Sequence, residues 1–126
     1  MSVGDELLEI ERELASEGGD AYRRHMLAHA LVVVPGMRLD RDSTAEAIDA
    51  SPGWDRFEIS DAQGIDLGGD AALVSYRFMG WRGEELYDAL LSSVYERAGS
   101  GGWRLALHQQ TPIPDAHPDD AAGAHG

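Results

Sequence analysis

The residues of this chain best suited to acid–base chemistry are two histidines and two tyrosines. His25 and His108 carry imidazole groups, which exchange a proton near neutral pH and can act as a base or an acid. Tyr22 and Tyr76 carry phenol hydroxyls that can donate hydrogen bonds. Together these groups would suit dehydration or cyclisation of a small carbonyl compound. In the structural alternative, His108 bonds the backbone near a sheet end, and His25 caps its helix or lies at the surface.

Thiol and metal chemistry find little support in the sequence. The chain contains no cysteine, which excludes disulfides and thiolate metal sites. His25 and His29 are four residues apart, but no glutamate follows His25 as it does in the zinc-protease motif. We expect His29 to lie beyond the end of its helix. We therefore predict no metal site and no cofactor.

The net charge of −13 is large for 126 residues. It argues against binding nucleic acid or an anionic membrane surface, because phosphate binding needs clustered Lys and Arg. No apolar run approaches the roughly 20 residues that span a membrane, and we expect a cytoplasmic protein. A solvated helix face is the expected place for the acids that crowd the N-terminal segment. These acids are Asp5, Glu6, Glu9, Glu11, Glu13 and Glu17.

Helical and strand periodicities occupy different parts of the chain. Val3, Leu7, Ile10 and Leu14 recur at helical spacing, and the two glycines at 18–19 end that helix. A second short helix follows, then a buried strand over 30–34, and then a third helix opened by a capping box at 43–46. Alternating patterns then predict four strands, over 57–65, 72–79, 86–97 and 103–111.

This segregation of helices and strands indicates the α+β class, since a parallel sheet needs the two to alternate. Four long strands joined by tight turns predict an antiparallel sheet covered by the N-terminal helices. We expect a single domain over residues 1–113. The following segment, 114–126, lacks apolar anchors and is predicted to be a disordered acidic tail.

Three segments give the chain a resemblance to a known superfamily. They are Tyr22-Arg23-Arg24-His25, the run from Ala30 to Gly36, and His108-Gln109-Gln110-Thr111-Pro112. With the order of elements, they resemble the nuclear-transport-factor-2-like superfamily, in its branch of uncharacterised SnoaL-like and ketosteroid-isomerase-like domains. The resemblance implies a cone-shaped, curved antiparallel sheet whose open end admits a small hydrophobic or mixed-polarity molecule. It also implies a homodimer formed through the outer face of the sheet.

The resemblance does not extend to the catalytic groups of ketosteroid isomerases. Those enzymes place a general-base aspartate where this chain has Val34, and a tyrosine where it has Ile10. Their second aspartate corresponds to Ser92, or to Ser93 if the register slips by one residue. The isomerase mechanism is therefore not expected here.

Three functions remain open at this stage. The first is a non-catalytic domain that binds a small molecule in an apolar pocket. The second is a lyase-, isomerase- or cyclase-like enzyme that acts on a small carbonyl or polyketide-like compound through His25 or His108 with tyrosines. The third is a protein-interaction or dimerisation domain. Its outer sheet face would carry Leu73, Met79, Leu90 and Val94.

Several side chains are candidates for the pocket of the first two functions. Asp88 either faces solvent or lies in the pocket with a raised pKa. The predicted ligand-binding residues are Tyr22, His25, Trp54, Tyr76, Ser92, Ser93, His108 and Gln110.

Overall fold

The structure is a computed structural model that describes residues 2–99 and 101–114. Helix α1 spans Val3–Ser16, and the Ser2 side chain caps it by accepting a 3.2 Å hydrogen bond from the backbone N–H of Asp5. Helix α2, Gly19–His25, follows after a sharp turn at Gly18, whose φ of 74° favours glycine. The predicted stop at 18–19 is therefore confirmed.

Helix α3, Arg41–Ala50, begins earlier than the capping-box pattern predicted. The Asp40 carboxylate caps it by accepting a 2.8 Å hydrogen bond from the backbone N–H of Ser43. Helices α2 and α3 pack closely at Gly19, whose backbone N–H donates a 2.9 Å hydrogen bond to Oδ1 of Asp49. A Cβ at Gly19 would lie only 2.7 Å from the same oxygen, so this close approach requires glycine.

Six strands form one curved sheet in the order β2-β1-β6-β5-β4-β3. The strands β3 to β6 pair antiparallel in succession, as the sequence predicts. Strand β1, however, runs parallel to β6, so the sheet is mixed. Parallel neighbours need a long connection, and here it consists of β2, α3 and three strands. The strands are β1 Met26–Val34, β2 Met37–Leu39, β3 Arg56–Gly68, β4 Ala71–Arg82, β5 Glu85–Arg97 and β6 Trp103–Pro112.

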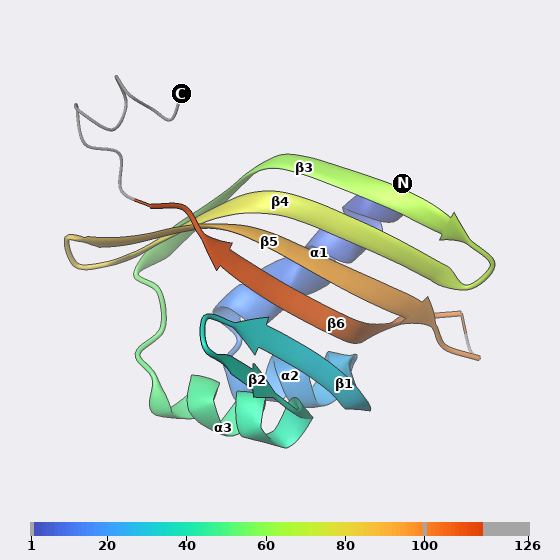
Figure 1. Ribbon diagram of the computed structural model, residues 1–126, viewed down its shortest axis with the longest axis horizontal. Coiled ribbons are helices and arrows are strands. Elements are labelled where there is room, and N and C mark those ends of the chain that lie inside the picture. Colours follow the sequence, from blue (N-terminus) through green and yellow to red (C-terminus); the bar gives the residue numbers. More distant parts are fainter. Residues whose placement is uncertain (1, 100, 115–126) are drawn as a thin grey trace.

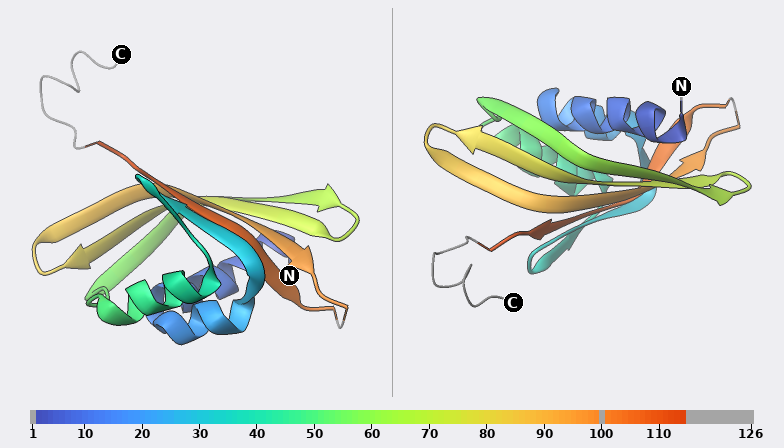
Figure 2. Two further views of the ribbon diagram at one scale, coloured as in Figure 1. Left: turned by 60° about the horizontal axis from the view of Figure 1, so that its bottom comes forward. Right: turned by 90° about the horizontal axis from the view of Figure 1, so that it is seen from above.

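All three helices lie on one face of the sheet, and the other face is uncovered (Figures 1 and 2). Strand β4 shows the resulting alternation, because its side chains are buried at every second position. The covered face of β4 carries Val74, Tyr76 and Phe78, each no more than 3% exposed. The α+β class, with a curved sheet under N-terminal helices, is thus confirmed.

Two sequence predictions lie at the margins of the described chain. The elements end at Pro112, while residues 115–126 of the predicted tail lie outside the described residues. Within the described residues, the longest helix has 14 residues, and no helix is long and apolar enough to cross a membrane.

Candidate functional site

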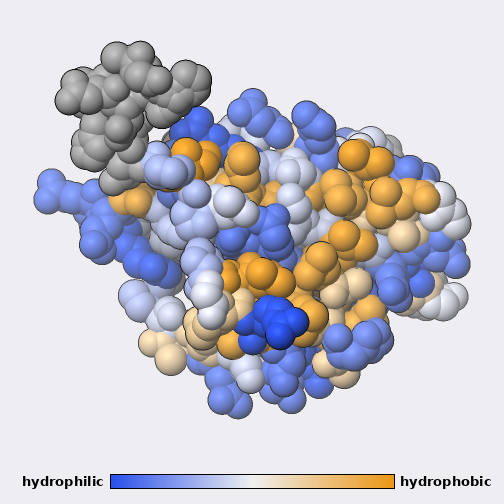
Figure 3. All heavy atoms as spheres, viewed as in Figure 1, coloured by the Kyte–Doolittle hydropathy of each residue, from blue (hydrophilic) through white to orange (hydrophobic). Residues whose placement is uncertain are grey.

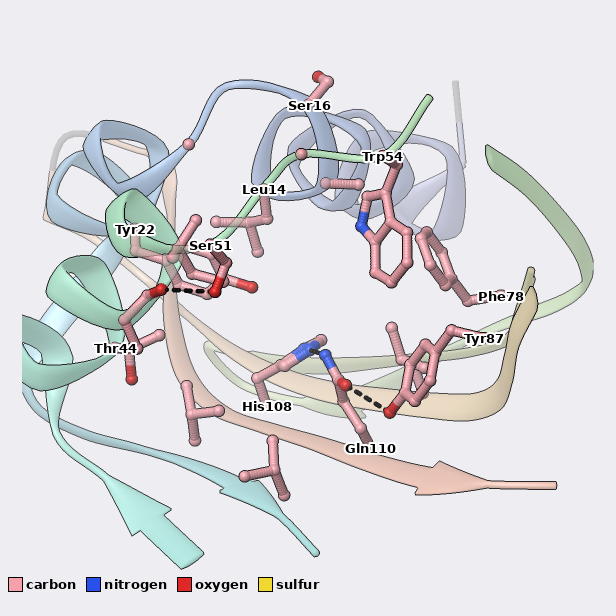
Figure 4. A pocket seen from close by; sticks show the side chains of 18 of the residues that line it. Leu14, Ser16, Tyr22, Thr44, Ser51, Trp54, Phe78, Tyr87, His108 and Gln110 are labelled. Carbon is pink, nitrogen blue, oxygen red and sulfur yellow. Dashed lines mark hydrogen bonds between the residues drawn. The ribbon is translucent and has the colours of Figure 1, made fainter. Parts of the chain in front are cut away.

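A cavity of about 700 Å³ lies between the helices and the covered face of the sheet. Figure 4 shows Tyr22 on one side of it, Trp54 and Tyr87 on the other, and His108 and Gln110 rising from β6 between them. Most of the wall is hydrocarbon. The apolar lining residues include Leu14, Val32, Val34, Leu39, Ile48, Phe57, Phe78 and Leu91.

The aromatic side of the cavity is built around Trp54, which follows the end of α3. Its ring stacks on Tyr87 at a centroid distance of 5.7 Å and meets Phe78 edge-on at 5.4 Å. The indole fits here because Gly80 lies beneath it, where a Cβ would approach Trp54 Cε3 to 2.7 Å. On the cavity rim, the Arg82 guanidinium lies 3.9 Å from the Trp54 ring centroid, within cation–π range.

A β-bulge in β6 directs His108 into the cavity. Tyr95 pairs with Leu105, but the next residue of β5, Val94, pairs with Leu107, so Ala106 is an extra residue. Strict alternation from Leu105 would have turned His108 to the uncovered face. The bulge shifts the alternation by one residue, as bulges beside functional sites do elsewhere. His108 and Gln110 therefore face the helices.

The hydrogen bonds of His108 define its tautomer. The Tyr87 hydroxyl donates a 2.7 Å hydrogen bond to Oε1 of Gln110, which turns the Gln110 amide nitrogen toward His108. That nitrogen lies 3.2 Å from His108 Nε2, so Nε2 accepts and the ring proton resides on Nδ1. His108 Nδ1 in turn lies 2.7 Å from Ser93 Oγ. Burial lowers the pKa of His108, although the nearby Glu11 carboxylate partly opposes this, and the ring is neutral at pH 7.

A buried carboxylate, Glu11, lies at the base of the cavity. It accepts hydrogen bonds from the hydroxyls of Tyr76 and Tyr95, one at each oxygen. Its Oε1 lies 3.6 Å from Nδ1 of His108. Two phenol donors, one at each oxygen, favour the carboxylate form of this side chain. Burial, and then the Glu11 charge, raise the pKa of Tyr76 and Tyr95, so both phenols remain protonated donors.

The expectation that Glu11 belongs to a solvated helix face is wrong. Glu11 is 1% exposed and shares the buried side of α1 with Leu7 and Leu14. The spacing 7, 11 and 14 is the signal that could have identified it, since residues three and four apart lie on one helix face. Its partners Tyr76 and Tyr95 lie far away in the sequence.

Five of the predicted ligand-binding residues line the cavity, and one supports it from behind. The lining residues are Tyr22, Trp54, Tyr76, His108 and Gln110. Ser93 faces the same side and lies within hydrogen-bond distance of His108.

The other predicted site residues lie elsewhere. His25 ends α2, where its Nε2 lies 2.8 Å from Oε1 of Glu13, outside the cavity lining. Ser92 points to the uncovered face, with its hydroxyl 3.0 Å from that of Ser75. His25 and His108 therefore do not form a pair, because a helix-end histidine and a sheet histidine project into different spaces.

Asp88 lies on the uncovered face of the sheet rather than in the cavity. Its carboxylate accepts two hydrogen bonds from the Arg77 guanidinium, at 2.9 and 2.7 Å. These bonds lower the pKa of Asp88, which excludes the alternative of a raised pKa in the pocket.

Comparison with solved structures identifies the fold. A proposed ketosteroid isomerase from Parabacteroides distasonis matches with a TM-score of 0.77 at 13% identity, covering 89% of this chain and 89% of that chain. A nuclear-transport-factor-2-like protein of unknown function from Prochlorococcus also matches with a TM-score of 0.77, at 19% identity over 92% and 97% of the two chains. The CamKII hub homology domain of Chlamydomonas reinhardtii matches with a TM-score of 0.71 at 15% identity, over 90% and 100%.

The chain has the nuclear-transport-factor-2-like fold. No protein-family model matches the sequence, and no curated protein matches it. Within this nuclear-transport-factor-2-like fold, Val34 lines the cavity with hydrocarbon, while Ile10 packs against the core. Neither side chain can exchange a proton, and Ser92 lies on the uncovered face.

Proposed function

We propose that this protein binds a small, mainly apolar molecule in the cavity and does not transform it. The observation that carries the proposal is the cavity itself, about 700 Å³ with mostly hydrocarbon walls and a smaller number of polar side chains. Small-molecule sites typically measure roughly 300–1,000 Å³ and have this composition. Protein interiors otherwise contain few voids larger than a water molecule, so a space of this size indicates a binding site.

The hydrogen bonds around the cavity favour binding over catalysis. Both oxygens of Glu11 accept from tyrosines, and both ring nitrogens of His108 have polar neighbours within the protein. A general base needs a free lone pair within reach of the substrate proton. The groups that could transfer protons are thus occupied in holding the cavity together.

Screening the purified chain against a small-molecule library by thermal shift and native mass spectrometry tests the proposal. We expect compounds that raise the unfolding temperature further as their concentration rises. Val34→Trp, which fills the cavity from β1, should abolish the shift. Val33→Trp, on the next residue and the opposite face, should retain it. A broad library without any binder, or binding that is equal in both variants, would contradict the proposal.

Catalysis through His108 is the second candidate, and the Glu11–His108 approach of 3.6 Å favours it. A carboxylate at that distance would stabilise an imidazolium if a ligand displaced the Gln110 amide and gave a proton to Nε2. The reaction would be of the lyase, isomerase or cyclase kind, on a small carbonyl compound. Incubating identified binders with the protein, followed by mass spectrometry of the small molecule, tests it: recovery of unchanged compound contradicts this candidate.

Self-association is proposed for the uncovered face of the sheet. One row of neighbouring positions crosses five strands there, and every member is aliphatic. Figure 3 views this face and shows hydrophobic side chains gathered on it. Three members of the row are 36–47% exposed. An exposed apolar surface of this kind usually marks an interface. The row consists of Ile65, Leu73, Val94, Leu107 and Leu31.

A further inference from the structure

Many polar groups around the cavity already have hydrogen-bond partners within the protein. Glu11 accepts from two tyrosine hydroxyls. Asp49 accepts from the Arg23 guanidinium and from the backbone N–H of Gly19. The hydroxyls of Thr44 and Ser51 donate their protons to backbone carbonyls one helical turn earlier.

The Tyr22 hydroxyl, in contrast, is an unused donor. Tyr22 is 5% exposed and lines the cavity, yet its hydroxyl makes no hydrogen bond to any residue within 2–99 and 101–114. Its oxygen is also not enclosed by protein atoms, unlike Nε1 of Trp103, so it opens onto the cavity. Burial raises the pKa of Tyr22, which keeps the phenol protonated and able to donate.

Further unused donors adjoin the same space. Figure 4 shows the indole nitrogen of Trp54 turned toward the cavity, and no described residue accepts a hydrogen bond from it. Gln110 uses one amide N–H toward His108 and has a second. Each of these donors faces the cavity without a protein acceptor, so a ligand that supplies an acceptor gains a hydrogen bond there.

We propose that the ligand presents a neutral hydrogen-bond acceptor to the Tyr22 hydroxyl. The chemical class is an apolar molecule with a ketone, ester or amide carbonyl. The acceptor would lie between α2 and β6, since the Tyr22 and His108 rings meet edge-on with centroids 6.5 Å apart. This inference rests on the proposed binding function and specifies the polar end of the ligand.

Charge distinguishes a neutral carbonyl from a carboxylate ligand. The Glu11 carboxylate lines the same cavity, and the whole chain carries a net charge of −13. A second buried negative charge would be repelled by both. Among the described lining residues, Arg82 carries the only fixed positive charge, and it lies over Trp54 with its Nε donating to Pro52 O at 3.0 Å. Its guanidinium is therefore held beside Trp54 and Pro52, while Tyr22 lies on the other side of the cavity.

A matched series of naphthalene probes tests the inference. Acetylnaphthalene carries the carbonyl, isopropenylnaphthalene replaces C=O by C=CH₂ with the same shape, and naphthoate carries a carboxylate. Dissociation constants are measured with the full chain by calorimetry or tryptophan fluorescence. We expect the ketone to bind about five- to tenfold more tightly than the alkene, as one hydrogen bond allows, and naphthoate to bind least tightly.

Tyr22→Phe should bring the ketone-to-alkene ratio to about one while leaving the affinity for the alkene unchanged, which verifies an intact cavity. Ser75→Ala is the control and should leave the ratio unchanged, since it removes a hydroxyl on the uncovered face that lies beside Ser92 and does not line the cavity. Equal binding of ketone and alkene to the unmodified chain, or tighter binding of naphthoate, overturns the inference and leaves the binding function intact. Failure of all three probes to bind also overturns the inference, whereas the binding function is contradicted only if the broad library gives no binder.

Discussion

The Tyr95 hydroxyl donates a 2.5 Å hydrogen bond to Oε2 of Glu11, a residue 84 positions earlier in the chain. Tyr76, on the neighbouring strand, donates to the other oxygen. One carboxylate therefore joins α1 to β4 and β5 at the base of the cavity. A buried charge is tolerated only where it is well hydrogen-bonded, so this arrangement fixes the helix on the sheet and shapes the cavity at the same time.

Glu11→Gln should lower the free energy of unfolding by about 1–3 kcal/mol. The amide has one oxygen, so it can accept from only one of the two phenols and sets an NH₂ group against the other. Urea denaturation followed by circular dichroism measures the change. Glu9→Gln, an exposed acid on the same helix, should alter stability by no more than about 0.5 kcal/mol. Equal effects from the two substitutions would show that Glu11 does not hold the helix.

Stability should fall as the pH falls below about 6.5, because His108 is buried in its neutral form. Its pKa is lowered in the folded chain, so below the unfolded value of 6.5 the unfolded chain binds more protons than the folded chain. This contribution is present above pH 6.5 and is lost at a slope of up to about 1.4 kcal/mol per pH unit. Urea denaturation at pH 7.5 and 5.5 checks it against His108→Gln. An unchanged slope in that variant would contradict the assignment.

Local patterns predicted the elements of the fold well. The residues 7, 10 and 14 mark α1, and the alternation from 72 to 79 marks β4, because helical and strand periodicities depend on neighbours in the sequence. The parallel pairing of β1 with β6 was not predictable in this way. It depends on where a chain segment of more than sixty residues returns, and no local pattern records that.

The site was predicted in its residue types but not in its geometry. Strict alternation would place Leu105 and Leu107 on one face and His108 on the other. The bulge at Ala106 instead turns His108 toward the helices. A bulge is not visible as a hydrophobic pattern. Glu11 was missed for a related reason. A carboxylate among other acids resembles a solvated face until its two distant tyrosine partners are known.

Gly80→Ala should disturb the cavity by displacing Trp54. The added Cβ would lie 2.7 Å from Trp54 Cε3 and 2.8 Å from Phe78 Cε2, so the stacked wall must move. We expect a loss of about 1–3 kcal/mol in stability from overpacking, a shift in tryptophan emission and weaker binding of acetylnaphthalene. Gly102→Ala is the control, because a Cβ there meets nothing within 4 Å. Retention of ligand affinity in Gly80→Ala would show that Trp54 is not part of the binding wall.

Leu107→Asp should convert an oligomer into a monomer. Leu107 lies within the aliphatic row on the uncovered face, between Val94 and Leu31, and a carboxylate buried there without a partner would oppose association. The net charge of −13 makes two copies of the chain repel each other. Contact between the aliphatic side chains of the row must therefore outweigh this repulsion.

Sedimentation velocity over a range of protein concentrations measures the effect. Ser43→Asp adds the same charge at the exposed start of α3, on the helical side, and should leave the oligomer intact. Salt gives a second readout, because screening the repulsion should strengthen association of the unmodified chain. An unmodified chain that sediments as a monomer at high concentration and high salt would contradict an interface on this face. Disruption by both substitutions would instead indicate that repulsion, not the aliphatic row, controls assembly.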